Sequence, residues 1–142
     1  MAVRWGFDLN APDAPERAEA ALAEQPGDAD RLVLVAAVRS SRGDDDAALD
    51  AARQAVAADP TSARAHTTLA TLLGRGGDRE GAAAEAGRAV ELDPGDPAAL
   101  YNRGLMLHDR GDRRGAAADF RRAGDILGVE VSAWWQRLRR PG

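Results

Sequence analysis

The sequence contains neither cysteine nor lysine. Without cysteine, disulfides and thiolate metal sites are excluded. Without lysine there is no phosphate-binding loop of the G-x-x-x-x-G-K-S/T type, and neither the H-E-x-x-H nor the G-x-S-x-G motif occurs. These absences remove common sequence signatures of catalysis and cofactor binding. We therefore expect no enzymatic activity, no cofactor and no bound metal.

Long apolar runs and concentrated positive charge are also missing. No stretch of about 18 apolar residues occurs, which is the length that a membrane-spanning helix needs. The first residues lack the unbroken apolar run of a signal peptide. The formal net charge of −4 does not favour nucleic acid, whose binding needs a concentrated basic face. We expect a cytoplasmic protein that binds neither membranes nor nucleic acid.

Alanine is abundant. It supplies 32 residues, against 23 leucines, valines and isoleucines together. Alanine has the highest helix propensity but buries little apolar area. The chain is therefore expected to form helices that pack closely through small side chains. All 19 basic residues are arginine, which is typical of a bacterial gene of high GC content.

Three sets of landmarks recur at intervals of 34 residues. They are Pro26, Pro60 and Pro94; the pairs Gly43-Asp44, Gly77-Asp78 and Gly111-Asp112; and the polar residues Asp28, Ser62 and Asp96. Aspartate and serine cap helix N-termini, and glycine adopts the left-handed backbone that ends helices. Each interval therefore predicts one helix that ends at the glycine and a second that begins after the next aspartate. The second helix ends before the proline, so the unit is a repeated helix–turn–helix.

Small residues recur at fixed phases within this unit. They are Ala36, Ala70 and Gly104 in the first helices, and Ala48, Ala82 and Ala116 in the second helices. With these phases, and with the segment Ala99-Leu100-Tyr101-Asn102-Arg103-Gly104, the sequence resembles the tetratricopeptide repeat (TPR) family. The resemblance implies an all-α fold, a right-handed superhelical solenoid of helix pairs.

The resemblance places full repeats at residues 29–62, 63–96 and 97–130. Residues 12–28 match the second helix of a preceding half repeat, and residues 131–140 look like the first helix of a following one. Residues 12–142 then form a single solenoid, preceded by an extended N-terminal segment at residues 1–11.

A TPR-like solenoid implies a protein that binds polypeptides on its concave face, which the first helices line. By resemblance, the groove positions are Val33, Ala37 and Ser40 in the first repeat, Arg64, Thr67, Thr71 and Arg75 in the second, Tyr101, Leu105 and His108 in the third, and Trp135 beyond them. The expected function is protein–protein interaction with a peptide or helix of a partner protein. Two alternatives stay open: a dedicated subunit that stabilises one enzyme complex, and a structural unit that self-associates through its terminal segments.

Some positions depart from the repeat pattern. Arg103 occupies a phase at which Val35 and Leu69 are apolar. Glycine interrupts the expected second helices, at a cost of up to about 1 kcal/mol each relative to alanine; these residues are Gly81, Gly87, Gly115 and Gly124. His66 falls between helices, where we expect a partly buried packing role.

The N-terminal segment has a different period. Val3, Trp5, Phe7 and Leu9 alternate with polar or small residues. Alternation of this kind suits an extended segment with one apolar face. We expect residues 3–9 to dock as an extended peptide on their own solenoid or on a neighbouring molecule. The candidate receptors are the groove near Tyr101 and Leu105 and the exposed side of the first helix pair; a disordered tail is the alternative.

Overall fold

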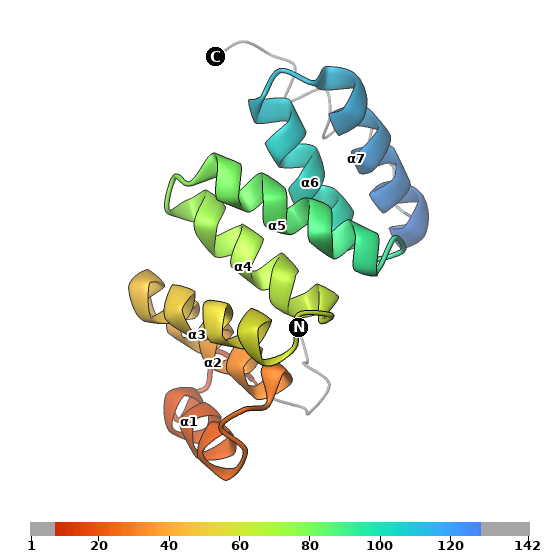
Figure 1. The fold of residues 1–142 in the computed structure, drawn as a ribbon. Helices are drawn as coiled ribbons and strands as arrows, with labels where there is room; N and C mark the ends of the chain where they lie inside the picture. The colour runs from red at the N-terminus through yellow and green to blue at the C-terminus, as the bar shows by residue number, and fades with distance from the viewer. Residues whose placement is uncertain (1–7, 129–142) are drawn as a thin grey trace.

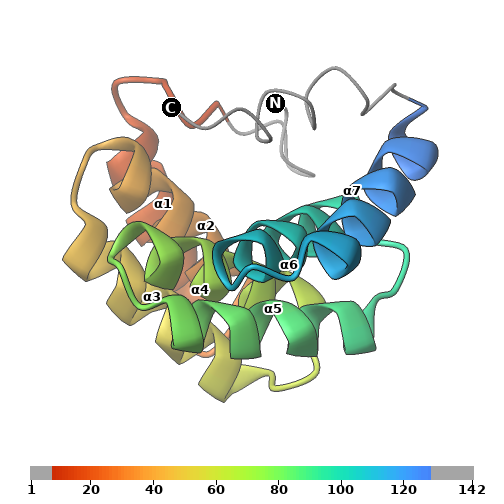
Figure 2. The same ribbon diagram turned by 90° about the horizontal axis from the view of Figure 1, so that it is seen from above.

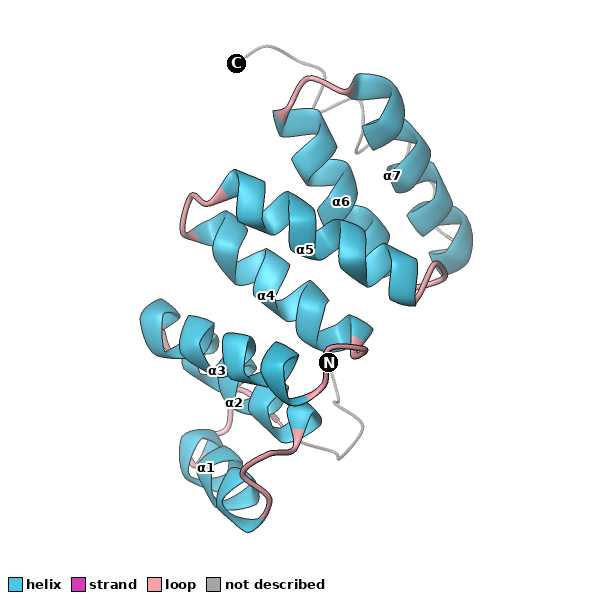
Figure 3. Ribbon diagram, in the orientation of Figure 1, coloured by secondary structure: helices cyan, strands magenta, loops and turns pink. Residues whose placement is uncertain are grey.

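The computed structural model describes residues 8–128, and within that range it contains seven α-helices and no strand (Figures 1 and 3). The helices are α1 (Ala14–Glu24), α2 (Ala29–Ser41), α3 (Asp45–Ala58), α4 (Ala63–Arg75), α5 (Arg79–Leu92), α6 (Pro97–Asp109) and α7 (Arg113–Leu127). Helices α2 and α3, α4 and α5, and α6 and α7 form three packed pairs, and α1 precedes them. The all-α array of helix pairs predicted from the sequence is confirmed.

The helix boundaries are set by the repeated landmark residues. Six N-cap side chains accept a hydrogen bond from a backbone N–H in the first helical turn, which satisfies a donor that the helix itself leaves unpaired. They are Asp28, Asp44, Ser62, Asp78, Asp96 and Asp112. Gly43, Gly77 and Gly111 have φ angles of 81°, 89° and 85°, the left-handed region that favours glycine. The predicted caps and turns are therefore confirmed.

The helix pairs stack into a curved array with α1 at one end and α7 at the other (Figures 1 and 2). The first helices of successive pairs contact each other, α2 with α4 and α4 with α6. Among the described helices, no comparable contact joins α3 to α5 or α5 to α7. The first helices are therefore closer together than the second helices, and they line the inner, concave side of the array.

Alanine builds much of the core between the helices of each pair. The three second-helix alanines at one phase, Ala48, Ala82 and Ala116, have no exposed surface. Such small side chains let helix backbones approach closely. Larger side chains, among them Val35, Val38, Leu69 and Leu73, then join the first pair to the second in one apolar cluster.

The segment before α1 is not extended where the structure describes it. Leu9 and Asn10 lie in a turn, closed by a hydrogen bond of 3.2 Å from the Ala11 N–H to the Asp8 carbonyl. The Asp8 carboxylate also accepts a hydrogen bond from the Asn10 N–H, at 2.9 Å, as aspartate does in many turns. The extended conformation predicted through residue 11 is therefore wrong for residues 9–11.

Other predictions concern residues 1–7 and 129–142, which lie outside the described range. They include the docking residues Val3, Trp5 and Phe7, the groove residue Trp135 and the helix expected at 131–140.

Candidate functional site

The concave side of α4 carries one stripe of polar side chains. Its members, Arg64, Thr67, Thr71 and Arg75, follow one another at spacings of three or four residues, which places them on one helix face. Because a helix rises about 1.5 Å per residue, the two arginines lie roughly 16 Å apart along the axis. The stripe therefore has an uncharged centre and a cation at each end.

The two threonines of the stripe use their hydroxyl protons within the helix. Thr67 Oγ1 donates to the Ala63 carbonyl at 2.9 Å, and Thr71 Oγ1 donates to the Thr67 carbonyl at 3.0 Å. A hydroxyl has one proton to donate but can still accept. Asn102 uses this capacity, because its Nδ2 donates to Thr71 Oγ1 at 2.9 Å. The centre of the stripe thus offers acceptors and methyl groups rather than donors.

Polar contacts on this face connect the first helices of all three repeats. Arg75 Nη1 donates to Ser40 Oγ at 2.6 Å, and Arg75 Nη2 lies 3.6 Å from Asp45 Oδ1. The bond from Asn102 to Thr71 links α6 to α4 on the other side. Contacts between exposed groups contribute little stability. Their effect here is to position the groove side chains of neighbouring repeats relative to one another.

The third repeat adds apolar surface to the groove. Tyr101 is 41 % exposed, and its ring centroid lies 5.9 Å from that of Phe120 in a tilted arrangement. Leu105 and His108, the other predicted groove residues of this repeat, are half-buried. An aromatic ring supported on one side and exposed on the other is a typical anchor for a protein ligand.

The first repeat differs from the prediction. Val33 is only 9 % exposed and packs in a cluster with Leu32, Ala55 and Ala65, against which Leu22 also lies. The assignment of Val33 to the open groove is wrong, because α2 lies between α1 and α4 and side chains from both neighbours cover this position. Ala37 is half-buried.

Asn102 is a groove residue that the sequence analysis did not single out. It stands next to Tyr101, and an amide on the residue after a predicted groove position is the signal that could have identified it. Its contact with Thr71 could not be predicted, because it depends on how two repeats are rotated relative to each other.

A pair of polar residues explains the arginine at an otherwise apolar phase. Arg103 Nε and Nη2 donate to Asp119 Oδ2 and Oδ1 at 2.7 and 2.6 Å, and Asp119 is 5 % exposed. These hydrogen bonds, which the Asp119 carboxylate accepts, raise the pKa of the Arg103 guanidinium above its ordinary value. This pair joins α6 to α7 within the third repeat.

A second polar pair joins α4 to α5 in the second repeat, and only its acidic member is at a position equivalent to that of the first pair. His66 is 6 % exposed; its Nδ1 lies 2.5 Å from Glu85 Oε2, and its Nε2 lies 2.8 Å from the Pro60 carbonyl. Glu85 and Asp119 are one repeat apart in sequence. Both ring nitrogens of His66 thus have hydrogen-bond partners within the protein. The packing role predicted for this residue is confirmed.

Within residues 8–128, no group of three or more histidines or acidic residues is arranged to hold a metal ion. In the same range, no helix combines the length and apolar character needed to span a bilayer.

The geometry defines a helical-repeat solenoid with an open concave face. No family model and no curated protein matches the sequence. Solved structures do match the fold. They include MamA, with a TM-score of 0.69 and 22 % identity over 82 % of this chain and 68 % of that one. They also include YrrB, described as a TPR protein with an unusual peptide-binding site, with a TM-score of 0.69 and 22 % identity over 87 % of this chain and 63 % of that one.

A third similar structure is the first TPR of Spaghetti (RPAP3) bound to the HSP90 peptide SRMEEVD. It aligns with a TM-score of 0.71 and 20 % identity over 78 % of this chain and 89 % of that one. Over residues 8–128, this chain therefore has the fold of TPR proteins, with three helix pairs preceded by one further helix.

Proposed function

We propose that the chain is a protein-interaction module that binds a peptide or helix of a partner protein along its concave face, and that it catalyses no reaction. The observation that carries this proposal is the stripe on α4 together with Tyr101 on α6. These side chains lie on one face, outside the core, and the centre of the stripe is uncharged. Two of the structurally similar proteins are described as peptide-binding or peptide-bound, which supports peptide binding as the function of this chain.

The side chains of the groove favour a particular kind of ligand. The acceptor oxygens of Thr67 and Thr71 suit backbone or side-chain N–H donors, and their methyl groups suit small apolar side chains. Arg64 and Arg75 suit acidic side chains at the two ends of the bound stretch. An extended strand rises about 3.3 Å per residue, so two such acids would be about five residues apart.

The test is selection of peptides from a random display library on the purified chain, followed by affinity measurements on groove variants. Tyr101→Ala and Arg64→Ala are expected to weaken the selected peptides about tenfold each, which corresponds to about 1.4 kcal/mol. Arg53→Ala, at an exposed position of α3, is the matched control and should leave affinity unchanged. Circular dichroism would verify that all variants are folded. Selected peptides that bind the groove variants as well as the parent chain would overturn the proposal.

A further inference from the structure

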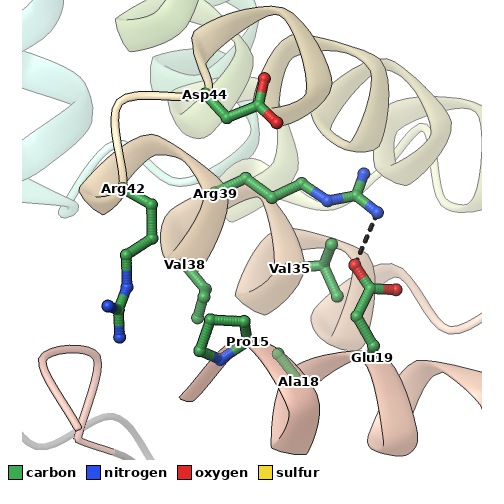
Figure 4. Close-up of a pocket in the computed structure, with 8 residues that line it drawn as sticks. All are labelled: Pro15, Ala18, Glu19, Val35, Val38, Arg39, Arg42 and Asp44. Carbon is green, nitrogen blue, oxygen red and sulfur yellow. Dashed lines mark hydrogen bonds and ion pairs between the residues drawn. The ribbon is translucent and has the colours of Figure 1, made fainter. Parts of the chain in front are cut away.

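A cavity of about 250 Å³ lies between α1 and α2, away from the concave stripe (Figure 4). Its floor is apolar, formed by Pro15 and Ala18 of α1 and by Val35 and Val38 of α2. The last three of these side chains belong to the main apolar cluster, so the cavity opens onto the core of the first repeat.

An arginine held in place lies at the rim of this cavity. Arg39 Nη2 lies 2.6 Å from Glu19 Oε1, and Arg39 Nη1 donates to the Ala47 carbonyl at 3.2 Å. A guanidinium beside an apolar floor favours an aromatic guest over an aliphatic one, because it can interact with the face of the ring. An apolar cavity of about 150 Å³ is sufficient to bind benzene. This cavity is therefore large enough for one aromatic side chain.

The chain before α1 is anchored at the same rim. Arg42, which lines the cavity, donates from Nη2 to the Ala11 carbonyl at 2.6 Å. Leu9 and Ala11 pack against the cluster that contains Ala18, Val35 and Val38. Phe7 precedes Ala11 by four residues, which can span at most about 14 Å. The first aromatic residue outside the described range is thus tethered within reach of an apolar cavity beside an arginine.

We infer that residues 3–7 dock on their own solenoid and that the ring of Phe7 occupies the cavity between α1 and α2. The short connection to Ala11 gives the ring an effective concentration on the order of millimolar or more, which favours docking within one molecule over exchange between two. The docked segment covers the outer edge of the first repeat and leaves the concave stripe free. This inference does not depend on the proposed peptide-binding function.

The absence of cysteine makes a cross-linking test specific. To keep the Phe7 ring, the neighbouring Gly6→Cys would be combined with Glu19→Cys at the cavity in one variant, and with Glu80→Cys on α5 in a control variant. Mild oxidation is expected to give an intramolecular disulfide in the first variant and not in the second. Equal cross-linking in both variants, or none in either, would overturn the inference. A disulfide-linked dimer of the first variant would show docking between molecules and would overturn it as well.

A second measurement keeps the natural side chains around the cavity. Phe7→Ala is expected to accelerate amide hydrogen exchange in α1 several-fold without changing exchange in α6, while Phe7→Tyr and the control Arg4→Ala leave α1 unchanged. Unaltered exchange in α1 after Phe7→Ala would count against occupation of the cavity by this ring.

Discussion

A Cβ atom added to Gly104 would lie 2.5 Å from Cε1 of Phe120, closer than any real side chain tolerates. Phe120 is 2 % exposed, so its ring fills the space that a side chain at residue 104 would need. The first and second repeats hold two alanines at the same phases, Ala36 with Ala52 and Ala70 with Ala86. The third repeat thus has one large side chain and no second one where the other repeats have a pair of small side chains.

This relationship predicts strong coupling between the two positions. Gly104→Ala alone is expected to destabilise the protein by about 1–3 kcal/mol, the usual cost of overpacking. In a Phe120→Ala background the same change should cost nothing, and it should regain up to about 1 kcal/mol from the higher helix propensity of alanine. Urea unfolding of the four variants in a double-mutant cycle measures the coupling. Additive effects would contradict it.

The buried carboxylate of Asp119 depends on Arg103. Arg103→Leu restores the apolar character of this phase but leaves Asp119 without its partner, so we expect a loss of about 3 kcal/mol, the lower end for a broken buried pair because Arg103 is partly exposed. Adding Asp119→Ala should recover most of this loss. The free energy of unfolding from urea titration is the measurement, and a double variant no more stable than Arg103→Leu would contradict the explanation.

The same pair has a defined pH dependence. Because Asp119 raises the pKa of the Arg103 guanidinium, its stabilisation is complete at every pH below the ordinary arginine pKa and is lost only as the pH rises through the raised value. The stabilisation by this guanidinium should therefore be the same at every pH between 6 and 9, an interval far below the titration of arginine, in which the free energy of unfolding is measured.

The hydrogen bonds of His66 predict different effects for two substitutions of Glu85. The Pro60 carbonyl can only accept a hydrogen bond, so His66 Nε2 carries a proton. His66 Nδ1 either carries a proton and donates it to the Glu85 carboxylate, or carries none and needs a donor. Glu85→Gln supplies a donor to a neutral ring, and its cost should be small. Glu85→Ala leaves Nδ1 unsatisfied and should cost about 1–3 kcal/mol. Thermal unfolding compares the two, and equal losses would argue against this arrangement.

Two helical glycines of α5 should respond oppositely to alanine. A Cβ at Gly87 would meet nothing within 4 Å, so Gly87→Ala should stabilise by about 1 kcal/mol through helix propensity. A Cβ at Gly81 would lie 2.5 Å from Oδ2 of Asp78, whose Oδ1 caps the same helix, so Gly81→Ala should gain little or lose stability. At the same phase of α3, the Ala47 N–H donates to Asp44 Oδ1 at 3.3 Å, a longer bond than the 2.9 Å from the Gly81 N–H to Asp78 Oδ1. Melting temperatures would rank the variants.

The groove is not expected to bind the acidic C-terminal tails of chaperones. TPR proteins that do so use lysine and asparagine at groove phases where this chain has Val33 and Ala37, and Val33 is also buried. Calorimetric titration with an acidic tail peptide, alongside its C-terminally amidated form as control, should show no micromolar binding that depends on the terminal carboxylate. Such binding, abolished by Tyr101→Ala, would refute the expectation.

The sequence predicts the helices and their order because the signals that set them are local. Each cap, such as Asp28 or Ser62, acts on a backbone N–H only three residues away. The turn at Leu9 is also a local signal, since Asp8 closes it, but the apolar alternation around it favoured an extended segment.

The groove could be predicted only in part, because its surface depends on contacts between helices. The burial of Val33 results from side chains of α1, α3 and α4, which no spacing within α2 reveals. Likewise, Arg103 departs from an apolar pattern within α6, while the carboxylate that accounts for it lies on α7. Periodicity identifies such an exception without identifying its partner.

The contacts of the described helices also determine how the chain can fold during synthesis. Within residues 8–128, no helix packs substantially against a partner more than two helices away along the chain. Ribosomes add about 5–20 residues per second, so each further helix pair takes seconds to emerge. Helical proteins with such local contacts fold in microseconds to milliseconds. Each pair therefore has time to dock on its predecessor before the next pair emerges. Its apolar face is exposed to solvent only for the time in which the ribosome adds one further helix pair.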